Sequence, residues 1–268
     1  MSVPTDSGGA TRDLVVGTRG PMSALELHGR IMPASNATFL GELDGRKVVY
    51  KPVAGERPLW DFPDGTLAGR EVAAYAVSQV VGWDVVPLTW LGEGPHGLGM
   101  LQEWQEPDPA QEAVTLVAPA EVPAGWRTVF EGVDDHDRDV TLIHEDTAPL
   151  RRMAVFDVIT NNADRKGGHV LEMASGHRYG VDHGLTFHHE AKLRTVLWGW
   201  HGEPLEDEDV AGVERVIGAL SGDLGETLAD HLTDLEITVL GRRCRRLLEH
   251  GVLPLPRGEW PSIPWPPF

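Results

Sequence analysis

The sequence predicts an α+β fold in which a strand-rich first half with one helix precedes a mostly helical second half. Residues 25–51 resemble three short strands separated by turn residues, whereas hydrophobic residues recur at helical spacing in much of the second half. The chain has 268 residues, of which 41% are hydrophobic. It is therefore long enough to form one large domain or two small lobes around a shared cleft.

The first half predicts an antiparallel sheet and one long helix. Asp44-Gly45 is a strong hairpin signal between two partly alternating runs. A helix is expected over residues 67–81, because apolar residues recur at helical spacing there and Gly82 can end it. Strands are expected at residues 25–31, 38–43, 47–51, 85–86, 89–91 and 98–104.

The second half predicts mainly helices. Residues 105–126 contain four prolines and predict an irregular connector. Helices are expected at residues 150–162, 206–220 and 226–249, the last of them capped by Gly251. The Pro- and Trp-rich end is expected to be extended, with Trp260 and Trp265 as anchors. These patterns divide the chain into a flexible tail (1–20), an N-lobe (21–104) and a C-lobe (105–268).

Composition excludes several classes of protein. The formal net charge of −18 has the wrong sign for a nucleic-acid binder and would be repelled by anionic membranes. The single cysteine excludes an internal disulfide framework and a four-thiolate zinc site. We find neither an apolar run long enough for a membrane span nor a secretory signal, so a cytoplasmic location is expected.

Four features carry candidate chemistry, and their order along the chain is informative. Lys51 ends a predicted strand, and Glu71 lies twenty positions later in the predicted helix. The other two are the run Asn162-Ala-Asp-Arg-Lys-Gly-Gly-His169 and the run Val181-Asp-His-Gly184. Each feature alone has a plain structural explanation: a solvated lysine, a helix-dipole carboxylate or a turn. Together they follow the order that phosphoryl transfer needs in a two-lobed kinase.

The two loop runs also resemble a known group of enzymes. Ala163-Asp-Arg-Lys-Gly-Gly-His169 is similar to the catalytic loop of phosphatidylinositol 3- and 4-kinase-like enzymes, and Val181-Asp-His-Gly184 is similar to their Asp-Phe-Gly motif. Over about residues 21–260, the chain resembles an actinobacterial family of uncharacterised proteins grouped with that clan, which includes HipA-type and Fam20-type kinases. The resemblance implies a two-lobed, protein-kinase-like fold with an antiparallel-sheet N-lobe.

Carried over by position, the resemblance implies a role for each residue. Lys51, paired with Glu71, would hold the ATP phosphates. Asp164 would be the catalytic base, and Asp182 the principal ligand of Mg²⁺ or Mn²⁺. The hinge that reads adenine would contain Gln102, Glu103 and Trp104, and the turn over the phosphates would contain Ser35 and Asn36.

The sequence departs from that pattern at two loop positions. His169 stands where the clan has Asn, and an imidazole ligand suits manganese or zinc better than magnesium. Lys166 replaces the loop His and is a second candidate catalytic residue, since it can neutralise a transferring phosphoryl group. Asn161 and Asn162 are adjacent, and the sequence does not indicate which one points inward.

The expected function is ATP-dependent transfer of a phosphoryl group to a hydroxyl, with a divalent metal. The acceptor stays open between a protein, a lipid head group and a metabolite. The alternative is a pseudokinase that binds nucleotide without transfer, and the loss of Asn at position 169 favours it. A third possibility, a metal hydrolase, would use some of the histidines His136, His144, His183, His188 and His189 with nearby aspartates, although no metal-binding spacing supports it.

Overall fold

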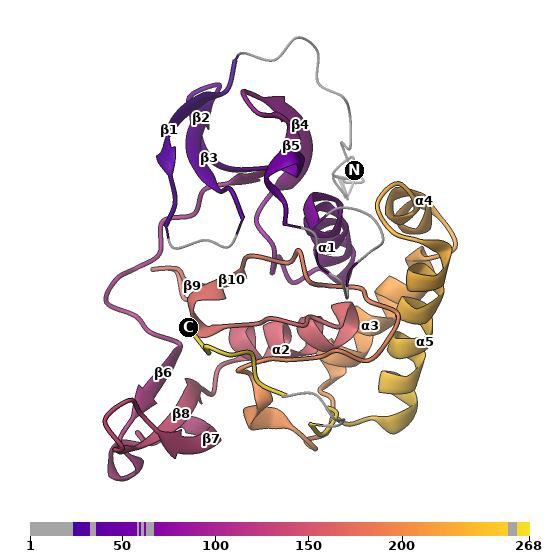
Figure 1. Ribbon diagram of the computed structural model, residues 1–268. Helices are drawn as coiled ribbons and strands as arrows, with labels where there is room; N and C mark the ends of the chain where they lie inside the picture. Colours follow the sequence, from indigo (N-terminus) through magenta and orange to yellow (C-terminus); the bar gives the residue numbers. More distant parts are fainter. Residues whose placement is uncertain (1–23, 33–35, 58, 60–61, 63–66, 257–261) are drawn as a thin grey trace, which may run out of the picture.

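The computed structural model describes residues 24–32, 36–57, 59, 62, 67–256 and 262–268. It has a mixed α+β fold with antiparallel sheets, as the sequence predicts (Figure 1). The predicted tail over residues 1–20, Ser35 and Trp260 lie outside the described residues. Among the helices that are described, none is both long and apolar enough to cross a membrane.

The first half forms a five-stranded antiparallel sheet in the order β1-β2-β3-β5-β4. The hairpin between β2 and β3 turns at Asp44 and Gly45, whose φ angles of 50° and 76° match the predicted Asp-Gly turn. The predicted strand at residues 85–86 is wrong: Val85 and Val86 lie in a buried loop, where Val86 N–H donates to Ser78 Oγ. The strands are β1 Glu26–Arg30, β2 Phe39–Leu43, β3 Arg46–Pro52, β4 Thr89–Gly94 and β5 Gly97–Glu103.

Helix α1 (Leu67–Val81) forms where the sequence predicts it. It lies between the five-stranded sheet and the other helices (Figure 1). Before it comes a short 3-10 turn, η1 (Val53–Gly55). The carboxylate of Glu56 caps α1 by accepting the N–H groups of Leu67 and Ala68 at 3.0 and 2.8 Å. Such side-chain oxygens satisfy the donors that a helix start leaves unpaired.

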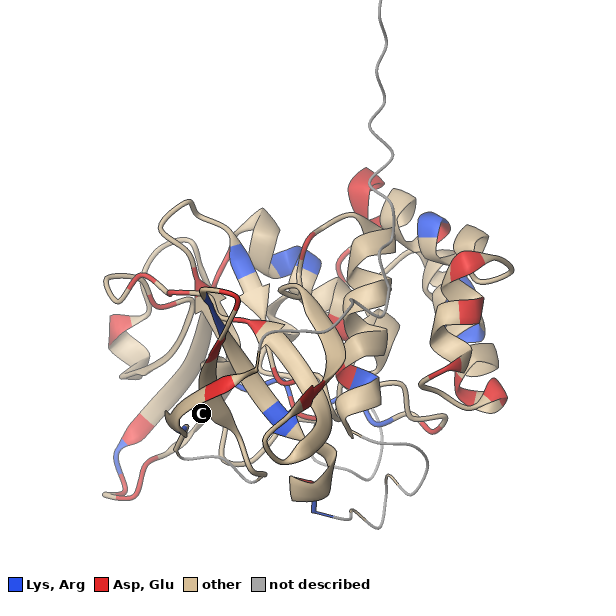
Figure 2. Ribbon diagram, turned by 90° about the horizontal axis from the view of Figure 1, so that it is seen from above, with Lys and Arg blue, Asp and Glu red and all other residues tan. Residues whose placement is uncertain are grey.

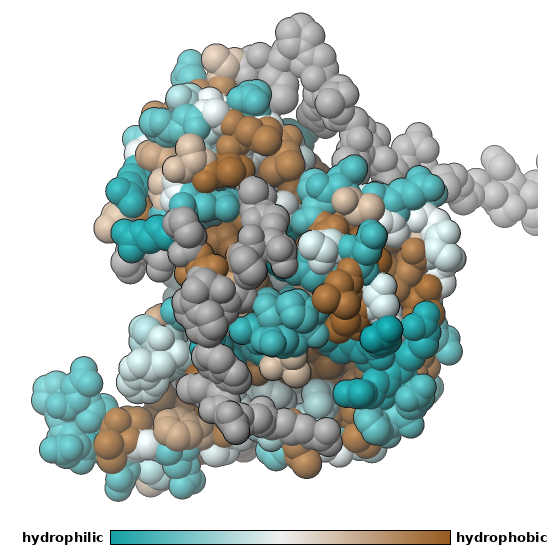
Figure 3. Space-filling view, turned by 45° about the vertical axis from the view of Figure 1, so that its right-hand side comes forward, coloured by the Kyte–Doolittle hydropathy of each residue, from teal (hydrophilic) through white to brown (hydrophobic). Residues whose placement is uncertain are grey.

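The connector expected over residues 105–126 is more ordered than predicted. It contains β6 (Val114–Val117), the 3-10 turn η2 (Pro119–Glu121) and the start of β7 (Trp126–Val133). With β8 (Asp139–Glu145) these strands form a second antiparallel sheet in the order β6-β8-β7. The prolines flank the strands rather than interrupt them, which is why their presence misled the prediction. This sheet projects from the molecule at lower left in Figures 1 and 3.

The described part of the second half contains four helices. The helix predicted over residues 226–249 is two helices, because Thr233 and Glu236 form a capping box that starts a new one. The helices are α2 Ala148–Thr160, α3 Asp207–Ala219, α4 Asp223–Ala229 and α5 Asp234–His250. Between α2 and α3 lie η3 Gly167–His169, the strand pair β9 Val170–Glu172 and β10 Arg178–Gly180, and η4 Trp198–Trp200.

Two hydrophobic cores hold these elements together. The larger core joins α1 to α2, α3, α4 and α5, so the helix that follows the sheet packs on the helical half. A smaller core lies within the sheet and is formed by Leu25, Leu43, Val48, Tyr50 and Leu101. In the view of Figure 2, Asp and Glu positions occur on many of the helices, strands and loops, in keeping with the net charge of −18.

Candidate active site

Strand β3 presents Lys51 to two carboxylates. Side chains alternate along a strand, so Lys51 lies on the face opposite the buried Tyr50. Its Nζ atom lies 2.7 Å from Glu71 Oε1 and 2.7 Å from Asp182 Oδ1. Burial acts to lower the pKa of Lys51, but Asp182 and Glu71 outweigh it and raise that pKa. Lys51 is therefore a fixed cation between residues that are far apart in the chain.

Glu71 joins α1 to the loop that carries Asp182. Its side chain is 2% exposed, and burial raises its pKa against the opposing effect of Lys51. While Oε1 meets Lys51, Oε2 accepts the backbone N–H of His183 at 2.8 Å. The same carboxylate thus orients both the lysine and the residue that follows Asp182.

Asp182 itself is half exposed and lies at the surface of this cluster. Its side chain is 52% exposed, and the charge of Lys51 is the main cause of its lowered pKa. The backbone φ of 59° is in the left-handed region, which Asp tolerates better than most residues. Asp182 is therefore an ionised carboxylate that solvent or a ligand can reach.

A buried ion pair supports the loop around Asp164. Arg165 and Asp157 are both fully buried, with Nη2 3.0 Å from Oδ1. Arg165 Nη1 also donates to the carbonyl oxygens of His169 and Val181, which ties this loop to the Asp182 loop. Sequence reasoning missed the structural role of this pair. The only available signal was a charged residue, Asp157, on the apolar stretch of a helix.

The two adjacent asparagines point to different places. Asn162 Nδ2 donates to Asp157, and its Oδ1 accepts the N–H of Asp164 at 3.0 Å. Asn161 ends α2 in the left-handed conformation and bonds instead to the segment that contains His188 and Glu190. Asn162 is therefore the residue that shapes the Asp164 loop.

Asp164 and Lys166 lie together on that loop. Their side chains are 26% and 21% exposed, and Lys166 Nζ lies 3.8 Å from Asp164 Oδ2. Burial is the main cause of the raised pKa of Asp164. The carboxylate remains accessible and beside a cation, so it can accept a proton from a hydroxyl group that approaches it.

His169 faces Asp182 across a short gap. Its Nδ1–H donates to the carbonyl of Asp164 at 2.9 Å, and Nε2 lies 3.5 Å from Asp182 Oδ2. Burial lowers the pKa of His169 to about 4, so near neutral pH the imidazole is uncharged and Nε2 carries a lone pair. Two electron-pair donors therefore face each other.

This pair of donors fits one divalent cation. An imidazole nitrogen with a carboxylate oxygen suits Mn²⁺ better than Mg²⁺. Within the described ranges, no group of three or more His, Cys, Asp or Glu side chains is arranged to hold a metal ion. Phosphate and water oxygens would have to complete the coordination, as they do in many nucleotide sites.

The described residues predicted for the hinge and the phosphate turn make their hydrogen bonds to other parts of the chain. Gln102 is buried and donates to Thr89 Oγ1, while the N–H groups of Glu103 and Trp104 donate to the carbonyls of Leu88 and Lys47. Asn36 Oδ1 accepts the N–H of Arg57 at 3.0 Å. The backbone N–H groups of Glu103 and Trp104 are therefore already hydrogen-bonded to carbonyl oxygens of the protein.

The histidines considered for a hydrolase are dispersed. His183 is buried against Arg165 and Phe156, His144 bonds to Gly199 N–H, and His188 stacks on His189. Their ring contacts are with arginine, aromatic and backbone groups.

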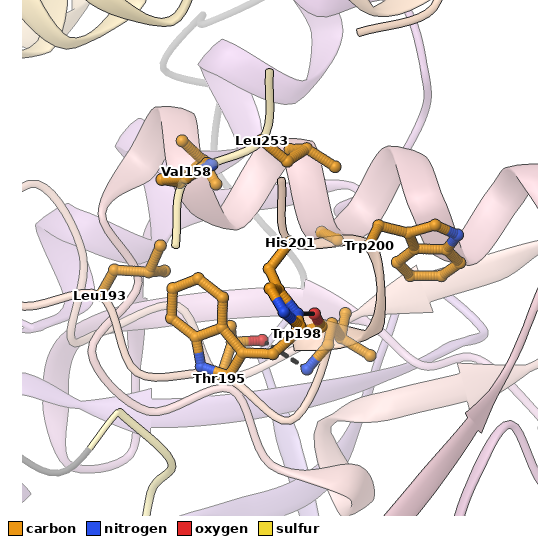
Figure 4. Close-up of a pocket in the computed structure, with 10 residues that line it drawn as sticks. Val158, Leu193, Thr195, Trp198, Trp200, His201 and Leu253 are labelled. Atoms are coloured by element: carbon orange, nitrogen blue, oxygen red, sulfur yellow. Dashed lines mark hydrogen bonds between the residues drawn. The ribbon is translucent and has the colours of Figure 1, made fainter. Parts of the chain in front are cut away.

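A small, mostly apolar hollow lies beside η4 (Figure 4). It is partly open to solvent and is lined by Val158, Leu193, Trp198 and Leu253 among others. His201 Nδ1 bonds to the carbonyl of Trp198. Trp200 is 1% exposed and Trp198 is 7% exposed, which fits a packing role. This hollow offers no charged group for catalysis.

The chain was compared with known proteins and structures. No protein-family model matches it. The solved structure of the Helicobacter pylori proinflammatory kinase CtkA has a TM-score of 0.47 and 11% identity, over 84% of this chain and 92% of that one. Protein Rv2133c of Mycobacterium tuberculosis is 52% identical over 257 residues, which are 91% of this chain and 92% of that protein. The chain therefore belongs to the same protein family as Protein Rv2133c.

Proposed function

We propose that the protein is an ATP-dependent phosphotransferase with a two-lobed, protein-kinase-like fold. The observation that carries this proposal is the position of Lys51 Nζ, 2.7 Å from both Glu71 and Asp182. These partners lie 20 and 131 residues away in the chain and belong to a helix and a loop. A lysine fixed by a helix glutamate beside a loop aspartate is the arrangement that kinases use for ATP phosphates.

Lys51 would hold the triphosphate, and Asp182 would hold a divalent cation beside it. ATP would replace the contact of Lys51 with Asp182 by contacts to phosphate oxygens, while Glu71 keeps the lysine oriented. Asp182 would then be free to join His169 in binding Mn²⁺ or Mg²⁺. When bound, the cation would neutralise charge on the phosphates. Asn36, with Ser35, would lie over the phosphates.

Asp164 would act as the base. The acceptor oxygen attacks the γ-phosphorus, the bond to the β–γ bridging oxygen breaks, and the hydroxyl proton passes to Asp164. Lys166, 3.8 Å from that carboxylate, is placed to offset charge on the transferring group. ADP leaves with the bridging oxygen, so atoms and charges balance.

Adenine would bind at the end of β5, around Gln102, Glu103 and Trp104. Since the N–H groups of Glu103 and Trp104 already donate within the sheet, adenine would be read by carbonyl oxygens or by the following residues. We therefore do not expect the N–H groups of Glu103 and Trp104 themselves to bind adenine.

A thermal-shift titration tests the proposal. ATP with Mn²⁺ should raise the unfolding midpoint more than ATP in EDTA, because a ligand that binds only the native state stabilises it. Asp182→Asn should abolish the metal-dependent part, whereas Asp135→Asn, an exposed aspartate in the β7–β8 hairpin, should retain it. Equal shifts in the wild type and Asp182→Asn would refute the proposed site.

The second candidate is a nucleotide-binding module without transfer. The observation that favours it is His169, an imidazole where kinases of this type have an amide oxygen. ADP formation from ATP separates the two functions. Stabilisation by ATP in EDTA without any ADP would favour the binding module, while metal-dependent ADP formation would favour the enzyme.

A further inference from the structure

The C-terminal segment, Ser262–Phe268, lies on the loop that carries Asp164. The backbone N–H of Gly167 donates to the carbonyl of Pro267 at 2.8 Å. The ring of Phe268 lies so close to Gly167 that a Cβ added there would overlap it. Figure 1 places the C-terminus near β9.

The other end of the segment is bound nearby. The carbonyl of Ser262 accepts the N–H of Thr195 at 3.1 Å and the indole N–H of Trp198 at 2.8 Å. Thr195 is bridged to Arg165, the residue after Asp164. The segment therefore contacts Gly167 directly and also contacts Thr195, which is bridged to Arg165 of the same loop.

The segment is held by two of its backbone carbonyls and by side-chain packing. The backbone N–H groups of Gly167 and Thr195 and the indole N–H of Trp198 donate to the carbonyl oxygens of Pro267 and Ser262, and the ring of Phe268 lies against Gly167. Main-chain hydrogen bonds of this kind bind extended peptides. Ile263 and Pro264 anchor the segment by burial, whereas Trp265 is 79% exposed, so the prediction that Trp265 is an anchor is wrong.

The base itself is not covered. Asp164 and Lys166 keep 26% and 21% exposure with the segment in place. Water can therefore reach Asp164, but an extended chain could not use the same three N–H donors. The N–H donors of Gly167, Thr195 and Trp198 form a surface beside the proposed base. This surface is suited to a polypeptide that brings a hydroxyl group to Asp164.

We infer that this surface binds a polypeptide acceptor and that Ser262–Phe268 occupies it as an internal competitor. The inference rests on the proposed phosphotransferase function, and it assigns the acceptor to the protein class. Release of the segment should increase transfer to a polypeptide more than it increases transfer to water.

Two neighbouring glycines give a matched test. Gly167→Ala requires the ring of Phe268 to move, whereas nothing lies within 4 Å of a Cβ at Gly168. Neither glycine has a positive φ, so alanine is tolerated by the backbone at both positions. With γ-labelled ATP and Mn²⁺, two products are measured: phosphate on dephosphorylated casein and ADP formed with water.

Gly167→Ala should raise casein phosphorylation relative to ADP formation by about tenfold, a shift of about 1.4 kcal/mol in the docking equilibrium. Gly168→Ala should keep the wild-type ratio. An equal ratio in both variants, or a fall for Gly167→Ala, would overturn the competitor role. ADP formation without casein phosphorylation in any variant would overturn the polypeptide acceptor.

A peptide of residues 262–268 provides a second test. Phe268→Ala should release the segment, and the peptide with Phe268 should then inhibit casein phosphorylation by that variant. The same peptide carrying Phe268→Ala should inhibit much less. Equal inhibition by both peptides would contradict binding at Gly167. If ATP neither raises the unfolding midpoint nor is converted to ADP, the phosphotransferase function is refuted, and the competitor role with it.

Discussion

At the scale of single residues, the protein pairs opposite charges at buried positions, where breaking the pair destabilises the fold. Glu71 is almost fully buried, and Lys51 is the cation that compensates it. Removing one partner of a buried pair leaves the other charge without compensation, which is strongly destabilising. The Lys51 cluster is therefore expected to matter for folding as well as for nucleotide binding.

Lys51→Met should lower the free energy of unfolding by about 3 kcal/mol near neutral pH. A second change, Glu71→Gln, should recover part of the loss, since it removes the uncompensated carboxylate. Urea unfolding measures both effects. The control is Lys47→Met, which changes an exposed lysine on the same strand. Equal stability of Lys51→Met and Lys47→Met would contradict the expectation.

Asp164→Asn should reduce phosphoryl transfer by about 10²- to 10⁴-fold, the usual contribution of a general base. The amide keeps the shape of the side chain, so the ATP-dependent rise in the unfolding midpoint should remain. Steady-state ADP formation provides the measurement. Full turnover in this variant would show that another group takes the proton.

At the scale of elements, α1 is attached to the helical half through the consecutive residues Arg70 and Glu71. Arg70, the preceding residue, pairs with Glu236 of α5 at 2.6 Å and donates to the carbonyl of Thr186. Glu71 in turn accepts the N–H of His183. The segment from His183 to Thr186 is thus held by two consecutive residues of α1, which fixes the backbone around Asp182.

The contact between β8 and η4 makes stability depend on pH. His144 is buried, its Nδ1–H donates to the carbonyl of Glu145, and its Nε2 accepts the N–H of Gly199. Only the neutral ring can make both bonds. Burial lowers the pKa of His144 to about 4, below the usual value of about 6.5 for the unfolded chain.

The unfolded state therefore binds the extra proton between pH 6.5 and pH 4. His144 makes its full contribution to the free energy of unfolding above about pH 6.5. This contribution falls by as much as about 3 kcal/mol as the pH drops to 4. His144→Gln should flatten this part of a urea-unfolding pH series, whereas the exposed control His136→Gln should not. Parallel pH profiles for the wild type and His144→Gln would contradict the assignment.

At the scale of the whole molecule, helix α1 connects the five-stranded sheet to the helical half. Among the described residues, it shares the larger core with α2 and α5, and it also contacts β4 and β5 of the sheet. The smaller core lies within the sheet. Lys51 and Glu71 therefore approach each other from elements that contribute to different cores.

Native-state hydrogen exchange tests that division. The amides of α1 should exchange together with those of α2 and α5, with more protection than those of β1–β3, because local stability follows the buried apolar contacts. Exchange is measured by mass spectrometry across a denaturant series. If α1 exchanged together with β1–β3, the assignment of this helix to the larger core would be wrong.

Local patterns determined much of the fold in advance. Hairpin residues such as Asp44-Gly45, and the apolar spacing of residues 67–81, specify turns and helices through interactions between near neighbours. Local patterns gave a wrong prediction at two places. The nearby prolines predicted an irregular connector where β6 forms. The continuous apolar stripe predicted one helix where the capping box at Thr233 starts a second one.

The sequence by itself determined the order of elements and the candidate set Lys51, Glu71, Asp164 and Asp182. Only the tertiary structure decided which of them touch, that Asp157 and Arg165 are a buried pair, and that Phe268 lies on Gly167. The physical reason is chain separation. Contacts across 131 residues, such as that between Lys51 and Asp182, depend on how whole elements pack, and no local pattern encodes that packing.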